Sequence, residues 1–249
     1  MINYNKYFFE DFTQIAYREL LKLAKQNFNF SDFESFNKEE NFILWRHDVD
    51  YSLELSLELA KIEHSFGVRS TFFILLHSDF YNPLEANATE IIREILLLGH
   101  KIGLHFDAQY YNISNENELD EWIVFEKNFL EKILKINITT FSFHNTNPFV
   151  LSCKKETYGG LTNTYQSFFQ DKADYCSDSH GIWRFKRLKE VLEKKENLQL
   201  QVLTHPEWWT KEILSPKEKI WKNIDDRALQ SKNNYRVMIS QMGVNVIDW

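Results

Sequence analysis

The sequence predicts an α/β fold in which mostly parallel strands form a distorted (β/α) barrel and the helices lie outside it. The first observation is the regular alternation of short apolar runs with longer amphipathic segments through residues 42–143. That order is typical of parallel β/α units joined by right-handed crossovers. The second is the length, because 249 residues can form one large α/β domain and no linker or internal repeat divides them. We therefore expect a single domain over residues 1–249, with an N-terminal helix and loop at 1–40 and a C-terminal helical extension at 210–249.

The individual elements follow from hydrophobic periodicity and from turn residues. Asn87 is the expected N-cap of its helix, and Gly67 and Gly99 are expected helix stops. Residues 28–40 and 145–173 are expected to be loops. Strands are predicted at 42–47, 69–76, 101–106, 138–143 and 198–204, with a strand end at 175–179 and a short piece at 182–185. Helices are predicted at 9–26, 51–65, 87–98, 115–136 and 187–196, and in parts of 210–233, where Pro216 interrupts the pattern.

The composition narrows the class of protein. A net charge of −7 argues against non-specific binding of nucleic acid. The two cysteines, Cys153 and Cys176, are most simply two free thiols, with a disulfide left open. No apolar run approaches the roughly 18 residues of a membrane span, and the N-terminus lacks the apolar core of a signal peptide. We expect a soluble cytoplasmic protein.

The stretch from Arg46 to Asp50 places charge at the end of a buried strand, where it requires partners. Side chains alternate in a strand, so Arg46, Asp48 and Asp50 share one face. Two carboxylates about 7 Å apart, at twice the strand rise of roughly 3.3 Å, suit one metal ligand beside one general base. A purely structural alternative is that Asp50 caps the next helix and pairs with Arg46.

Histidines recur where the predicted strands end. The carboxyl ends of parallel strands meet at one edge, where α/β active sites lie. Asp and His around an open coordination position are typical of a catalytic Zn²⁺ or a related divalent ion. A carboxylate beside the ion can take a proton from bound water, and a histidine opposite can protonate a leaving amine. The strand-end histidines are His47, His77, His105, His144 and His205. The residues that could supply this chemistry are Asp48, Asp50, His105, His144 and His205.

At these positions the chain resembles the polysaccharide deacetylase superfamily, the NodB-like or carbohydrate esterase family 4 group. Trp45–Asp50 resembles the first family motif, Gly99–His105 resembles the Gly-His-x-Ile-Gly-x-His motif, and Val202–His205 resembles the last motif. Ser70–Phe73 is similar to the second strand of the family. The resemblance implies a distorted (β/α) barrel and metal-dependent removal of an N- or O-acyl group from a sugar.

Carried over residue by residue, the resemblance implies that Asp48 is the base, that Asp50 and His105 bind the metal, and that His205 is the acid. The chain departs from the family at two points. A valine separates the two aspartates, and Gln109 stands where the family has a second metal-binding histidine. We assign the missing ligand to His144, with His47 or His77 as the alternatives.

Together with these residues, the resemblance implies a metal-dependent hydrolase that removes an N-acyl (acetyl) group from an amino sugar or a sugar precursor of a surface glycan, as in lipopolysaccharide biosynthesis. Zinc is the expected metal, with cobalt or nickel as alternatives. One of Trp208 and Trp209 is expected in the cleft and the other in the core. The alternatives are a catalytically degenerate carbohydrate-binding protein and an amidohydrolase acting on a non-sugar amide. The expected substrate-binding residues are Arg46, His47, His77, Gln109 and Trp208.

Overall fold

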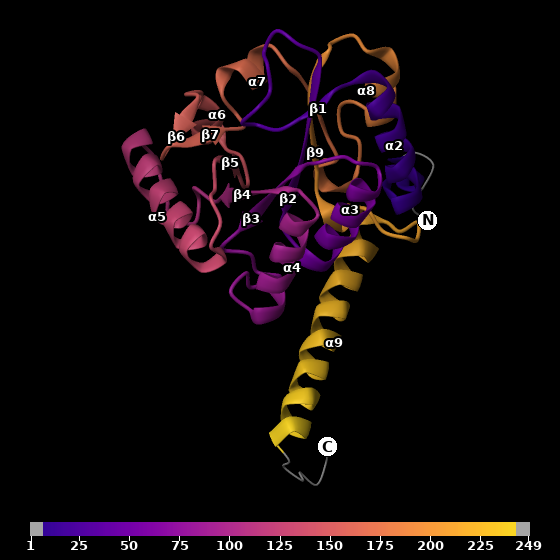
Figure 1. The fold of residues 1–249 in the computed structure, drawn as a ribbon, viewed down its shortest axis with the longest axis vertical. Coiled ribbons are helices and arrows are strands. Elements are labelled where there is room, and N and C mark those ends of the chain that lie inside the picture. Colours follow the sequence, from indigo (N-terminus) through magenta and orange to yellow (C-terminus); the bar gives the residue numbers. More distant parts are fainter. Residues whose placement is uncertain (1–6, 243–249) are drawn as a thin grey trace.

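A curled, mostly parallel sheet forms the centre of the molecule, with helices packed on its outer side (Figure 1). The structure is a computed structural model and describes residues 7–242. The strands follow the order β6-β7-β5-β4-β3-β2-β9-β8, and β1 pairs with β2 beside this path. Within the described residues only the β6–β7 pair is antiparallel, and no ladder joins β6 to β8. The predicted fold class, a distorted (β/α) barrel of mostly parallel strands with outer helices, is confirmed, and the structure adds that the barrel is incompletely closed.

The strands and helices alternate along the chain as the sequence predicts through β5. The strands are β1 (Phe30–Ser31), β2 (Phe42–Val49), β3 (Thr71–Leu75), β4 (Lys101–Phe106), β5 (Thr140–Phe143), β6 (Thr157–Tyr158), β7 (Leu161–Asn163), β8 (Asp174–Ser177) and β9 (Gln199–Thr204). The α-helices are α2 (Gln14–Asn27), α3 (Leu53–Ser65), α4 (Ala86–Leu97), α5 (Glu116–Leu134), α6 (Pro148–Ser152), α7 (Ser167–Asp171), α8 (Leu188–Lys194) and α9 (Pro216–Met242). Three 3₁₀ turns are η1 (Phe9–Phe12), η2 (Ser179–Gly181) and η3 (Pro206–Trp208).

Several predicted boundaries were wrong for local reasons. The helix expected at 9–26 is split at Thr13, whose backbone is extended and whose hydroxyl accepts a hydrogen bond from the N–H of Ala16, capping α2. The N-cap of α4 is Glu85, and Asn87 lies within its first turn. The expected loop 145–173 contains two short helices and the β6–β7 hairpin, whereas residues 182–185 form no strand. Pro216 begins α9 instead of interrupting a helix, since proline fits a first turn.

The two faces of β2 have different surroundings. Phe42 and Leu44 point into the barrel, where they join Phe33, Phe73 and Phe169 in an apolar plug at the amino end of the strands. On the other face, residues such as Ile43 and Trp45 pack beneath the outer helices. The barrel interior is therefore filled with apolar side chains at its amino end, and the pocket opens at the carboxyl ends of the strands.

Gly103 makes this packing possible. A Cβ at this position would lie 2.5 Å from the ring of Phe73 and 3.0 Å from the carbonyl oxygen of Thr140. The glycine lets the aromatic ring lie across β4, and His105, two residues later, emerges on the same face above it.

No described helix is both long enough and apolar enough to traverse a bilayer.

Candidate functional site

A pocket of ≈ 860 Å³ opens at the carboxyl ends of the central strands. Asp48 and Asp50 reach it from the end of β2, His105 from β4, His144 from just beyond β5 and His205 from just beyond β9. Five groups from four segments that are far apart in sequence thus lie in one cavity because their strands are parallel and in register.

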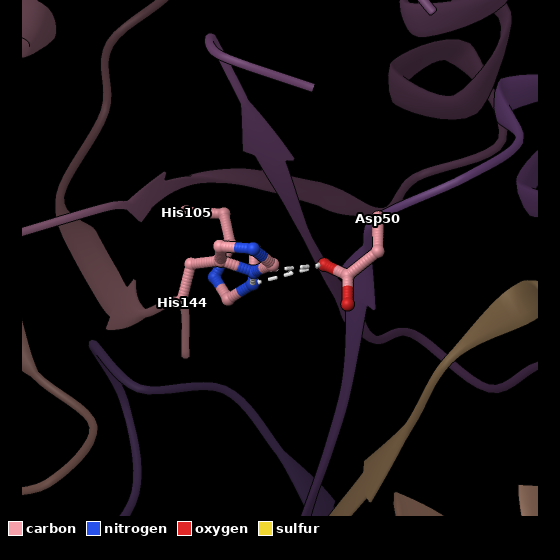
Figure 2. Close-up of side chains that lie close together, drawn as sticks. All are labelled: Asp50, His105 and His144. Atoms are coloured by element: carbon pink, nitrogen blue, oxygen red, sulfur yellow. Dashed lines mark hydrogen bonds and ion pairs between the residues drawn. The ribbon is translucent and has the colours of Figure 1, made fainter. Parts of the chain in front are cut away.

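Three of these side chains converge on one point. Asp50 Oδ1 lies 3.1 Å from Nε2 of His105 and 3.4 Å from Nδ1 of His144, and the two nitrogens are 3.2 Å apart. Figure 2 shows both imidazoles directed at the Asp50 carboxylate. Burial favours the neutral acid, but the imidazoles of His105 and His144 hold the pKa of Asp50 well below its usual range. Asp50 is therefore an anion facing two imidazole nitrogens.

This donor set fits a divalent transition metal. One atom from each side chain lies within 4.8 Å of the others, and two nitrogens with one carboxylate oxygen is a common catalytic arrangement. Asp50 Oδ1 is buried and makes no hydrogen bond of good geometry with the described residues, which leaves its lone pairs directed at this point. The three residues are those that the sequence nominated as ligands.

Gln109 does not join this cluster. Its side-chain N–H donates to the carbonyl of Asn145 at 2.7 Å and so braces a residue with a φ of 47°. The amide of Asn145 lies 2.8 Å from Nε2 of His144. This contact, made by the amide nitrogen Nδ2, fixes the orientation of the imidazole, whose Nδ1 faces Asp50 and His105. Gln109 therefore supports the turn that carries His144.

Asp48 lies beside the cluster, and hydrogen bonds from two neighbouring side chains fix its carboxylate. Its Oδ2 accepts hydrogen bonds from the guanidinium of Arg46 at 3.3 Å and from the hydroxyl of Ser142 at 3.0 Å, and it is 3.9 Å from Nε2 of His105. Burial acts to lower the pKa of Arg46, but the Asp48 carboxylate outweighs it and raises that pKa above its ordinary value. The other oxygen, Oδ1, has no hydrogen-bond partner among the described residues. Asp48 is thus an anchored carboxylate with one oxygen available at the pocket.

His205 faces the cluster from the opposite side, with Nε2 4.0 Å from Asp50 Oδ2. Its Nδ1 lies 2.6 Å from Asp178 Oδ1, and Asp178 also accepts hydrogen bonds from the backbone N–H of His205 and the indole of Trp209. Burial opposes the charged imidazole, but Asp178 raises the pKa of His205 to about 10. His205 is therefore protonated at neutral pH.

The remaining predicted residues divide between the pocket and other places. His77 lines the pocket and contacts Glu126 and the hydroxyl of Tyr111, both at 2.9 Å. Trp208 also lines the pocket, whereas Trp209 is fully buried beside Asp178. Neither His77 nor Trp208 reaches the metal-ligand cluster.

His47 lies on the opposite face of β2, outside the barrel. Its Nε2 is 2.9 Å from the buried Glu63 of α3, and its Nδ1 is 2.8 Å from the hydroxyl of Thr204. Tyr17 and Ser70 donate further hydrogen bonds to Glu63. The structure thus places His47 in a buried network between the sheet and the helices, so we do not assign it to substrate.

Sequence reasoning missed Asp178 and Ser142, which hold the two groups proposed to move protons. Asp178 directly follows β8 and Ser142 lies in β5, so both belong to the strand-end pattern. The signal for Asp178 was its position within the predicted strand end at 175–179. Ser142 gives no chemical signal, because a buried serine is common in any strand.

No protein-family model and no curated protein matches the chain. Several solved structures do. A family 4 carbohydrate esterase from Bacillus anthracis is 15% identical over 87% of this chain and 86% of that chain, with a TM-score of 0.44. The peptidoglycan deacetylase PdaC from Bacillus subtilis is 14% identical over 83% and 99%, with a TM-score of 0.46.

A family 4 carbohydrate esterase (CE4) pseudoenzyme from Bacillus anthracis is 11% identical over 76% of this chain, with a TM-score of 0.44, and the match spans 63% of that longer protein. The first of these structures is described as a family 4 carbohydrate esterase, and this third one as a CE4 family pseudoenzyme.

Proposed function

We propose that the pocket is the active site of a metal-dependent hydrolase that removes an N-acyl group, typically acetyl, from an amino sugar or a sugar precursor of a surface glycan. The observation that carries the proposal is the placement of Asp50, His105 and His144 around one point. The Asp48 carboxylate, fixed by Arg46, lies on one side of this point, and the His205 imidazolium, fixed by Asp178, lies on the other. Ion pairs that only stabilise the fold would not need three potential metal ligands together with one proton acceptor and one proton donor in the same cavity.

The side chains divide the work as follows. Asp50, His105 and His144 would hold a divalent ion, zinc or alternatively cobalt or nickel, and such an ion when bound acidifies water and polarises a carbonyl. Asp48 accepts the proton of the attacking water through its free Oδ1, since Arg46 and Ser142 fix its Oδ2. His205 donates the proton that the departing amine requires, because Asp178 keeps its imidazole charged.

The walls of the pocket support a sugar as the substrate. Tyr51, Phe80 and Trp208 line one part of it, and the amides of Gln109 and Asn145 line another. Aromatic faces with a few polar groups suit a ring that carries both C–H faces and hydroxyls. Gln109, His77 and Trp208 remain our substrate-side residues, and Arg46 acts through Asp48. We place the reaction on a cytoplasmic precursor.

Metal binding and acetate release test the proposal together. Zn²⁺, Co²⁺ or Ni²⁺ should raise the melting temperature of the chelator-treated protein, and the Asp50→Ala variant should abolish that increase. Asp50→Ala and His205→Ala should each abolish acetate release from N-acetylated sugars. His64→Ala is the matched control, because His64 is an exposed histidine bonded to the carbonyl of Leu98, outside the pocket. Full activity of Asp50→Ala or His205→Ala would refute the assigned roles.

The position of Gln109 keeps a second candidate open, a carbohydrate-binding protein without catalysis. It predicts sugar binding in a calorimeter that is unchanged by chelator and by Asp48→Asn. An amidohydrolase acting on a non-sugar amide would share the metal dependence and both variants' losses. An activity assay on a panel of acylated sugars and simple N-acyl amines separates that case, because an amidohydrolase of this kind would hydrolyse only the N-acyl amines.

A further inference from the structure

The helix α9 (Pro216–Met242) leaves the body of the protein. Figure 1 shows its C-terminal half projecting well beyond the other elements. Its start is anchored, because the buried Nζ of Lys219 donates to the carbonyls of Phe12 and Trp208. Further along, Arg227 pairs with Glu85. Of the described residues in α9, only Lys219 is fully buried.

A stripe of apolar and small residues, which we call the seam, runs along α9. Its members are three or four positions apart, as the a and d positions of a coiled coil are. At about 100° per residue the seam lies roughly 130° around the helix from Lys219 and Asn223, which face the body, and Arg227 lies between these two directions, at the edge of the seam. The exposed fractions are 59% for Trp221, 46% for Ile224, 42% for Tyr235, 41% for Met238 and 64% for Met242, and the exposed Ala228 and Ser231 complete the seam.

We propose that the seam is a dimer interface, and that α9 pairs in antiparallel fashion with α9 of a second copy of this chain. The seam matches itself in one antiparallel register. Ala228 then lies opposite Ser231 of the second copy, Ile224 opposite Tyr235, and Trp221 opposite Met238. Small residues meet at the centre and large residues meet towards both ends, so the two helices can approach closely. Because the seam faces away from the body, the two bodies lie on opposite outer sides of the helix pair.

Charge supports this register independently. Asp225 and Lys232 flank the seam on the same side, and both are exposed. Neither forms a salt bridge with another described residue of its own chain. In the antiparallel register Asp225 lies opposite Lys232 of the second copy, and the two-fold axis produces this pair twice. A parallel pair would instead bring Arg227 next to Lys232, two like charges. The charges therefore select a second copy in antiparallel orientation.

Mass measurement across a concentration series tests the interface. The wild-type chain should reach twice the mass of one chain in sedimentation or light scattering, and Ile224→Asp should remain at the mass of one chain. Leu229→Asp is the matched control. Leu229 is an exposed leucine of the same helix, at 55% against 46% for Ile224, but it lies outside the seam, so this variant should dimerise like the wild type. Unchanged circular dichroism would show that Ile224→Asp remains folded.

A charge exchange tests the orientation. Lys232→Glu and Asp225→Lys should each weaken the dimer by about tenfold, because each replaces two attractive pairs by two repulsive ones. The double variant Asp225→Lys/Lys232→Glu should recover the wild-type dissociation constant. Tightening by Lys232→Glu alone would instead show a parallel pair, because it removes the like-charge contact with Arg227.

Three results would overturn the proposal. These are a wild-type monomer at every concentration up to the solubility limit, equal loss of dimer in Ile224→Asp and Leu229→Asp, or failure of the double charge exchange to restore pairing. Binding of α9 to lipid vesicles with no dimer in solution would assign the seam to a membrane surface and would equally refute it. None of these measurements depends on the catalytic activity.

Discussion

Lys219 is a buried cation that should make the protein more stable as the pH rises. Its side chain is almost fully buried, and its Nζ contacts the carbonyl oxygens of Phe12 at 2.9 Å and Trp208 at 2.5 Å. Burial lowers the pKa of Lys219 to about 7, although the charge of Asp178 acts in the opposite direction. We expect Lys219→Met to remove this pH dependence.

The sign and size follow from proton linkage. In the unfolded chain a lysine has a pKa of about 10.4, so between pH 7 and 10 the unfolded state binds more protons than the folded state. The free energy of unfolding therefore rises with pH in this window. From pH 7 to pH 10 the gain is about 3.5 kcal/mol, at about 1.4 kcal/mol per pKa unit. The two carbonyl acceptors favour the ammonium and reduce the gain, so this figure is an upper value.

Urea unfolding followed by tryptophan fluorescence at pH 7 and pH 10 measures the effect. The quantity of interest is the difference between wild type and Lys219→Met, because other titrating groups cancel in it. Lys222→Met is the control, since Lys222 is an exposed lysine one turn away, paired with Asp226. Its difference from wild type should not change with pH. Parallel pH profiles for wild type and Lys219→Met would refute the reasoning.

Three further substitutions test the site and its scaffold. Asp178→Asn should lower acetate release by about 10²-fold, because the neutral amide no longer keeps His205 charged. The stabilisation by bound metal should be unchanged. An acetate assay and calorimetry with Zn²⁺ measure these two outcomes. Arg46→Met should lower the free energy of unfolding by about 3–5 kcal/mol, because it leaves the Asp48 carboxylate buried without its cation, and Asp48→Asn in the same chain should recover part of it. Gly103→Ala should cost about 1–3 kcal/mol in urea unfolding through overpacking of the barrel interior; no loss would show that the neighbouring ring moves freely.

The sequence predicts the sheet well where simple periodicities apply. The strand at 101–106 has the predicted bounds, and β2 extends two residues beyond its predicted end. Convergence of Asp50, His105 and His144 could be anticipated because parallel strands end at one edge. Alternation likewise puts Arg46, Asp48 and Asp50 on one face, and the observed pairing of Arg46 with Asp48 follows from it.

The same alternation should have separated His47 from the pocket, since an odd step along β2 turns a side chain to the outer face. Other features depend on contacts between distant segments, which a single sequence does not reveal. Asp178 acquires its role only because β8 lies beside β9, and Gln109 only because its amide reaches the turn at Asn145. The break between η1 and α2 depends on the single N-cap hydrogen bond at Thr13.

The open edge of the sheet changes what Arg46 does. Since no backbone ladder joins β6 to β8 within residues 7–242, side chains bridge the interior there. The guanidinium of Arg46 reaches the hydroxyls of Thr164 and Tyr165, and Gln201 donates to the carbonyl of Thr164. The buried guanidinium of Arg46 thus orients the Asp48 carboxylate and also links the two sides of the barrel interior at the open edge. Substitutions at Gln201 and Thr164 would therefore change this side-chain bridge without removing the charge of Arg46.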